Sequence, residues 1–332
     1  MSFYGAFRMS SFVLSLCLMH TCTAHAQICP QRGDLDDGYC DANRDLVADS
    51  PATGKNPDRL VLGVSSVEDA QTAMKTYSPL VDYLKGCLKK DVQLYPPVGE
   101  ANVLEGMRTG QVHVAQFATG GTMYAVNFAG AVPFAGKGPA GTGKRDTYTL
   151  MLIVKTESAY QKPIDLKGKQ IAHTSVTSNS GNLAPRALFP ELGLTPEKDY
   201  KVAFSGKHDK SIIGVQLGLY DAAAVASDVF ERLVAKGDIK RHQFRVIYES
   251  EEFPPDAFSH AHDLDPKLAG DIKRCFYDFH FPELMSKQLE NNDRFFAVDY
   301  AKDWKLVRLI AKASGVQMSK GAYQAIVATK KK

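Results

Sequence analysis

The residues that could do chemistry in this sequence gather where short apolar runs end. The segment Thr177–Asn182 (Thr-Ser-Asn-Ser-Gly-Asn) carries hydroxyl and amide side chains between an expected strand and an expected helix. The first N–H groups of a helix lack intrahelical partners, so such a position binds oxyanions without Lys or Arg. Ordinary N-capping is the alternative, although one such side chain is enough for a cap. The ligand-binding residues predicted here are Ser178, Asn179, Ser180 and Gly181.

Two further segments add side chains of opposite hydrogen-bonding character. His208 lies in Ser205–Ser211 and can donate to an anion, although a loop histidine is more commonly a surface residue. Asp228 follows the expected strand Ala222–Ala226, whose small side chains indicate a crowded, buried position. A carboxylate accepts from a protonated oxyanion and repels a fully ionised one, so Asp228 favours a ligand that keeps a proton. Its alternative role is to cap the following helix.

A fourth segment, Ala118–Tyr124, contains two adjacent glycines after another expected strand. Glycine permits close backbone approach, so we expect the hydroxyls of Thr122 and Tyr124 to face the ligand, with a plain turn as the alternative. The sequence holds no nucleophile–base set, no Walker loop and no G-x-G-x-x-G after a strand. The sequence therefore does not predict an enzyme.

The apolar pattern places these segments in two α/β units. The expected strands are 59–64, 92–95, 112–117, 147–155, 166–172, 201–205, 222–226 and 244–249, and the expected helices are 70–88, 101–109, 180–189, 210–219 and 229–236. Ligands of such sheets bind beyond the carboxyl ends of strands. We expect one lobe from 58–150 plus 256–332 and a second from 151–255.

Composition agrees with a globular protein of two domains. The chain has 332 residues, of which 44 % are hydrophobic and 23 % charged, and its net charge is +3. This near balance predicts no nucleic-acid partner. A leader is expected at 1–26, with Arg8, the apolar run Phe12–Met19 and the cleavage pattern Ala24-His25-Ala26. Its alternative is an N-terminal anchor. The leader predicts export, to the periplasm.

Residues 27–57 are expected to form an extension held by a disulfide between Cys29 and Cys40, because export favours bridging of close cysteines. Cys87 and Cys275 lie in expected helices and could pair or stay buried.

The extension also resembles a calcium loop in its spacing of oxygen side chains. Leu46 and Ala52 replace the glycine and glutamate of that loop, and a solvated acidic turn is the alternative. A structural calcium ion is the one cofactor considered. Its candidate ligands are Asp41, Asn43, Asp45 and Asp49.

Four motifs occur in order and together resemble the PhnD-type substrate-binding proteins of phosphonate and phosphite ABC importers. They are Ser178-Asn-Ser-Gly-Asn-Leu-Ala-Pro185, Ser205-Gly-x-His208-Asp209, Ala222-Ala-Ala-Val-Ala-Ser-Asp228 and Pro254-Pro-Asp256. The resemblance covers about residues 58–300. It implies a type II periplasmic binding protein, an α/β fold of two lobes hinged by crossover strands.

The resemblance also implies roles for single residues. Ser178, Asn179 and Ser180 would bind oxyanion oxygens, although the family usually has Thr in the middle. His208 and Asp228 match its anion-binding histidine and an acid of the site. Two further matches are Asp256, at a position that often meets a ligand's amino group, and Glu100, where an aromatic contact is common and an acid disfavours a dianion.

Phrases around Ala118 and Ser178 are similar to the AioX-type arsenite sensors, which signal to a membrane histidine kinase. Those sensors carry a Cys near the place of Met123, so thiolate capture of arsenic does not carry over. The main prediction is a monomeric, non-enzymatic oxyanion-binding protein of an ABC importer, and the alternative is an oxyanion sensor for a kinase. A third hypothesis is an exported metal hydrolase using Asp41–Asp49 or His260 and His262.

Overall fold

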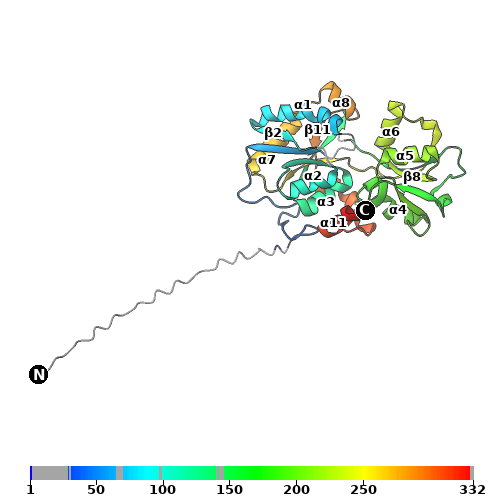
Figure 1. The fold of residues 1–332 in the computed structure, drawn as a ribbon, viewed down its shortest axis with the longest axis horizontal. Helices are drawn as coiled ribbons and strands as arrows, with labels where there is room; N and C mark the ends of the chain where they lie inside the picture. Colours follow the sequence, from blue (N-terminus) through cyan, green and yellow to red (C-terminus); the bar gives the residue numbers. More distant parts are fainter. Residues whose placement is uncertain are drawn as a thin grey trace.

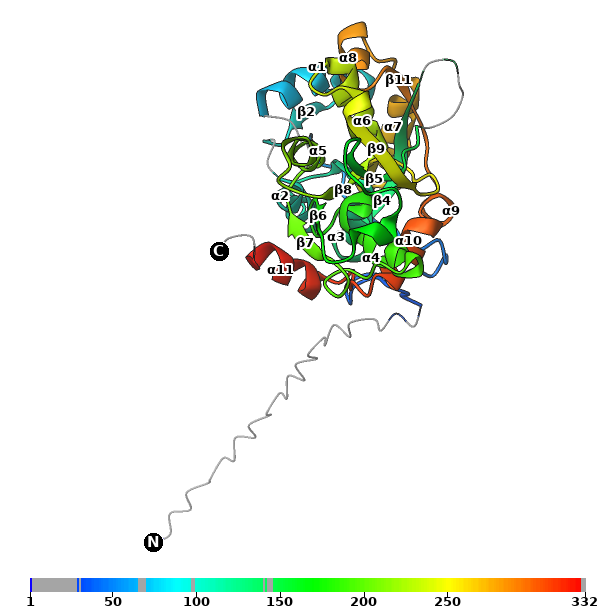
Figure 2. The same ribbon diagram turned by 90° about the vertical axis from the view of Figure 1, so that its right-hand side faces the viewer.

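The computed structural model describes residues 1, 29, 31–64, 70–96, 99–139, 141 and 146–329. The strands form two separate sheets, each flanked by helices, so the molecule has two α/β lobes side by side (Figure 1 and, turned, Figure 2). Apart from Met1, the predicted leader at 1–26 lies outside the described residues.

The first sheet has six strands in the order β11-β4-β10-β3-β1-β2. β1 is parallel to β2 and β3, whereas β10 and β11 pair antiparallel with their neighbours. Its strands are β1 (Arg59–Val64), β2 (Asp91–Leu94), β3 (Val114–Phe117), β4 (Ala131–Pro139), β10 (Ala257–Ala261) and β11 (Asn292–Ala297). Its helices are α1 (Ala70–Leu88), α2 (Glu100–Arg108), α3 (Thr119–Ala129), α7 (Pro266–Asp278) and α8 (Glu283–Gln288).

The second sheet has five strands in the order β7-β6-β8-β5-β9. They are β5 (Leu150–Lys155), β6 (Gln170–His173), β7 (Lys201–Phe204), β8 (Ala222–Ala226) and β9 (Phe244–Glu249). The alanines of β8 are fully buried at its centre, where only small side chains let α5 approach so closely. Around the sheet lie η1 (Pro163–Leu166), η2 (Asn179–Leu183), α4 (Ala184–Leu188), η3 (Phe189–Leu192), α5 (His208–Leu217), α6 (Ser227–Lys236) and η4 (Arg241–Gln243).

The C-terminal helices, which the sequence placed in the first lobe, contact both lobes. They are α9 (Tyr300–Asp303), α10 (Lys305–Ala313) and α11 (Lys320–Thr329). Trp304, Val307 and Ile310 are buried in one apolar cluster with second-sheet residues such as Leu152, and α10 packs on α4. In contrast, α11 packs on α3, and its Tyr323 lies in the first-lobe core. The sequence did not predict the contact of α10 with the second lobe, because chain order alone does not show which sheet an amphipathic helix covers.

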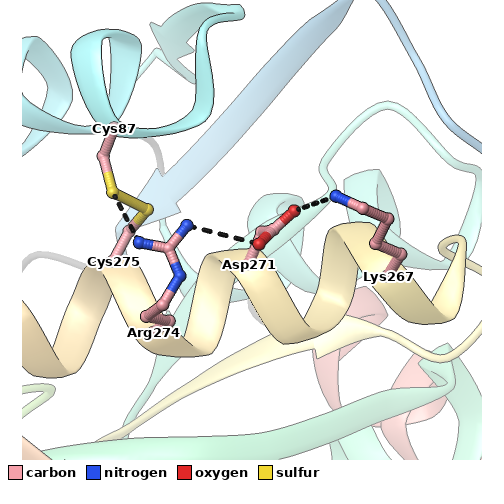
Figure 3. The surroundings of a disulfide bond; sticks show 5 residues. All are labelled: Cys87, Lys267, Asp271, Arg274 and Cys275. Carbon is pink, nitrogen blue, oxygen red and sulfur yellow. Dashed lines mark hydrogen bonds and ion pairs between the residues drawn. A yellow bond between two sulfur atoms is a disulfide. The ribbon is translucent and has the colours of Figure 1, made fainter.

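A disulfide between Cys87 and Cys275 joins α1 to α7. The sequence alone leaves open whether these two cysteines pair. Arg274 lies beside it, with Nη1 3.8 Å from Cys87 Sγ and Nη2 bonded to Asp271, which also pairs with Lys267 (Figure 3). The bridge closes a long stretch of chain, so it limits the freedom of the unfolded protein.

The bridge predicted between Cys29 and Cys40 is not formed in the structure, where both are free thiols. The two thiols nevertheless form a hydrogen bond with each other. This bond lowers the pKa of Cys29 and raises that of Cys40 to about 11. Close spacing brought the thiols together, and their oxidation state is set by the surroundings of the protein.

We expect the thiols of Cys29 and Cys40 to be oxidised to a disulfide in the exported protein, because the periplasm is an oxidising compartment. Alkylation under denaturing, non-reducing conditions should then label none of the four cysteines beyond residue 26, and alkylation after reduction should label all of them. The matched control is a Cys40→Ser variant, in which Cys29 alone should be labelled without reduction. Labelling of both Cys29 and Cys40 in the unreduced wild-type protein would show that the pair stays reduced.

The acidic loop of the extension does not gather its oxygens at one point. The carboxylate of Asp41 accepts from the N–H groups of Asp45 and Leu46, and Asp49 accepts from Ala42 N–H and the Asn43 amide. Among the described residues no group of three or more His, Cys, Asp or Glu side chains is arranged to hold a metal ion. As folded, the carboxylates of the loop are bonded to its own backbone and to Asn43, and calcium binding stays a prediction.

Candidate ligand-binding site between the lobes

The predicted anion loop follows β6 and begins with a wide turn. Ser178 Oγ accepts from Gly181 N–H at 3.1 Å, and Ser178 O accepts from the N–H groups of Asn182 and Leu183. The chain forms the π-turn η2 before α4, rather than the single α-helix that the sequence predicted at 180–189. Gly181 is required because an added Cβ would collide with Thr174 Oγ1.

His208, the first residue of α5, contacts this loop. Ala226 N–H donates to His208 Nδ1 at 3.1 Å, so the imidazole proton lies on Nε2, which is 3.3 Å from Ser178 Oγ. Burial lowers the pKa of His208 to about 4, so the ring is neutral at pH 7. The structure thus joins two predicted residues into one donor group that needs no protonation.

Asn179 and Ser180 are buried against Tyr148, which precedes β5. Asn179 Nδ2 donates to Tyr148 Oη at 3.2 Å, while Asn179 Oδ1 is buried with no partner among the described residues. Burial raises the pKa of Tyr148 to about 12, although its hydrogen bonds with Thr119, Asn179 and Ser180 oppose the rise. The sequence did not identify Tyr148, which lies in a crossover segment with no motif around it.

Asp228 lies in the first turn of α6 and does not cap it, because the N-cap position belongs to Ala226 and has no side-chain bond. Burial raises the pKa of Asp228 to about 6, Glu290 adds to the rise, and Arg232 and Lys137 oppose it. Asp228 Oδ1 is buried and lacks a partner in the described part of the chain. Asp228 Oδ1 can therefore accept a hydrogen bond from a ligand.

We expect Asp228→Asn to stabilise the ligand-free protein at pH 7.5 and not at pH 4. The pKa of Asp228 is raised in the folded state, so its protonated form contributes fully to stability below the unfolded-state pKa near 4. This contribution is lost as the pH rises through about 6. Because Asp228 is only half-buried, the gain should be near 1 kcal/mol, a rise in Tm of roughly 2–4 °C. Thermal unfolding at both pH values measures it, and an equal Tm difference at the two values would refute it.

Asp256 lies just before β10 and forms an ion pair with Lys137 of β4, Oδ2 to Nζ, at 3.3 Å. A second ion pair joins Arg232 of α6 to Glu290, which follows α8. Glu290 raises the pKa of both Asp228 and Asp256, so the four charged groups and Asp228 form one electrostatic cluster between the lobes. Sequence reasoning missed Lys137, Arg232 and Glu290. A lone lysine in the small-residue strand β4 was the one available signal.

The glycine-rich segment after β3 is helical, which corrects the expectation of a ligand-facing loop. Every residue of α3 is buried. Thr122 Oγ1 donates to Phe117 O and Ala118 O, and Tyr124 packs against Phe128 and Tyr323. Thr122 and Tyr124 therefore point into the first lobe instead of the site. Met123 is likewise a buried core residue.

The start of α3 approaches the second lobe closely. An added Cβ at Gly120 would collide with the carbonyl oxygen of Thr177, next to the anion loop. Ala118 N–H donates to Glu100 Oε2 at 3.1 Å, and an added Cβ at Gly121 would meet the same carboxylate. Glu100 thus stabilises the positive end of the α3 dipole, and the adjacent glycines make room for these contacts.

Two α/β lobes joined through the β4–β5 and β9–β10 connections form the type II fold that periplasmic binding proteins share. The family model described as "ABC transporter, phosphonate, periplasmic substrate-binding protein" matches residues 62–304. The chain belongs to this family, and it is a periplasmic protein. Within the described residues we find no helix with the length and apolar character that a bilayer span requires.

Relatives and solved structures agree with this family. The phosphate-import protein PhnD of Mycolicibacterium smegmatis is 27 % identical over 231 residues, 66 % of this chain and 71 % of the relative. The phosphonates-binding periplasmic protein of Escherichia coli is 24 % identical over 212 residues, 62 % of each chain. PhnD1 of Prochlorococcus marinus in complex with methylphosphonate has a TM-score of 0.65 at 19 % identity, covering 77 % of this chain and 98 % of that chain. At this identity the structural likeness shows the fold alone.

Proposed function

We propose that this protein binds a partly protonated oxyanion of the phosphonate, phosphite or phosphate type between its lobes and delivers it, as a monomer, to an ABC permease. The combination of donors and unpartnered acceptors carries the proposal. The Ser178 hydroxyl, which accepts from His208 Nε2–H, can donate its own proton to an anionic oxygen, whereas Asn179 Oδ1 and Asp228 Oδ1 can only accept. A ligand with both P–O⁻ and P–OH groups satisfies both sets.

The family supports binding without turnover, because its members are substrate-binding proteins. No specific observation favours the sensor alternative. Met123 stands in place of a thiol and is buried in the core, so arsenite would need a different mode of capture.

Calorimetry of the exported protein with phosphate, phosphite, methylphosphonate, arsenate and arsenite tests the proposal. We expect saturable binding of at least one of the phosphorus oxyanions. Ser178→Ala should weaken that binding about 5-fold, since a net hydrogen bond is worth about 1 kcal/mol. Ser78→Ala, at an exposed position on α1, is the matched control and should leave affinity unchanged. Absence of heat with all five ligands would refute the proposal.

A further inference from the structure

Lys137 is a buried lysine in the middle of a strand of small and apolar residues. Its side chain is 11 % exposed and that of its partner Asp256 is 15 % exposed. A lysine is rarely buried unless an acid pairs with it, since desolvation of an ammonium group is costly. The pair therefore reflects a specific requirement of this site rather than a solvated surface.

The ammonium of Lys137 stays charged at neutral pH. Burial by itself lowers the pKa of a lysine, but Asp256, Tyr77 and Glu290 outweigh that effect and hold the pKa of Lys137 above its ordinary value. Burial and Glu290 raise the pKa of Asp256, and the ammonium opposes this rise. The protein thus supplies its own cation to the acidic part of the site.

The ion pair leaves one acceptor open. Asp256 Oδ2 faces Lys137 Nζ, whereas Asp256 Oδ1 is buried and has no partner among the residues that the structure describes. A hydroxyl group of a ligand can donate to that oxygen without adding charge. A ligand ammonium could reach Asp256 only by coming close to the Lys137 ammonium, and like charges in a site of low dielectric repel strongly.

We propose that Lys137 is a specificity-determining residue, whose built-in ammonium makes the site select oxyanions that carry no ammonium group of their own. The proposal rests on the proposed function and names its substrate class. Alkyl and inorganic phosphorus oxyanions fit, and aminoalkyl phosphonates are rejected. Removal of the Lys137 charge leaves Arg232 as the compensating cation that the described residues supply to Asp256 and Glu290. A ligand ammonium then supplies the missing positive charge.

A matched ligand pair tests the proposal. Propylphosphonate and 2-aminoethylphosphonate differ by a methyl group in place of an ammonium group. We expect the wild-type protein to bind propylphosphonate at least 10-fold more tightly in calorimetry. Lys137→Met, which keeps most of the side-chain volume, should reverse the preference. Lys137→Arg, which keeps the charge, should retain the wild-type preference.

The double variant Lys137→Met/Asp256→Asn covers the case in which Lys137→Met does not fold. It removes both charges of the pair, so the protein should fold and lose most of its discrimination. Equal wild-type affinity for the two ligands, or an unchanged preference in Lys137→Met or in the double variant, would overturn the role of Lys137. Failure of the wild-type protein to bind any phosphorus oxyanion would instead overturn the proposed function.

Discussion

Replacing Gly120 with alanine should weaken ligand binding by about 100-fold. The new methyl group would collide with the backbone carbonyl of Thr177, and a backbone group next to the anion loop has no rotamer by which to move aside. Thr119, one residue before, is fixed by its hydrogen bonds to Pro254 O and Pro255 O and by Trp304 Nε1, which donates to Thr119 O. Strain of about 3 kcal/mol therefore falls on the loop that carries Ser178.

Gly121→Ala is the matched control for this prediction. Both substitutions add the same methyl group to the same helix, so the gain in helix propensity of up to about 1 kcal/mol is common to both. At position 121 the three atoms nearest to the methyl group all belong to the carboxylate of Glu100, the end of a flexible side chain. Calorimetry with the ligand that the wild-type protein binds should show a much smaller loss for Gly121→Ala. Similar affinities of the two variants would contradict the proposed lobe contact.

Local patterns predicted several elements well, because their signals lie within a few residues. The buried strand Ala222–Ala226 and the long helix Ala70–Leu88 have the predicted limits. Ser178 and His208 lie together because each follows a strand of the same sheet, and parallel β6 and β7 end at the same edge.

The parts that sequence analysis missed depend on contacts between distant segments. The glycines of α3 indicated a loop, but the helix is buried by packing against α2, α11 and the second lobe, which overrides the weak helix propensity of glycine. From the sequence alone Lys137 would be expected to face solvent, and its burial is explained only by the ion pair with the distant Asp256. Arg232 and Glu290 belong to different lobes, and no local pattern brings them together.

The Arg232–Glu290 ion pair should act as a latch between the lobes. Arg232 lies on α6 and Glu290 follows α8, and these two helices lie at the top of their respective lobes in Figure 1. Each of the two side chains is 23 % exposed. Glu290 has a φ of 59°, a backbone conformation that costs a non-glycine residue energy. A contact that spans the division between lobes stabilises the closed arrangement that holds the ligand.

We expect Arg232→Gln to weaken ligand binding by about 30-fold, near 2 kcal/mol, because a charged hydrogen bond is lost and Glu290 is left beside Asp228 and Asp256. Glu290→Gln should cost less, since it also relieves repulsion among the three acids. The double variant Arg232→Gln/Glu290→Gln should recover part of the affinity lost by Arg232→Gln. A calorimetric double-mutant cycle measures this coupling, and strictly additive losses would show that the pair does not hold the lobes together.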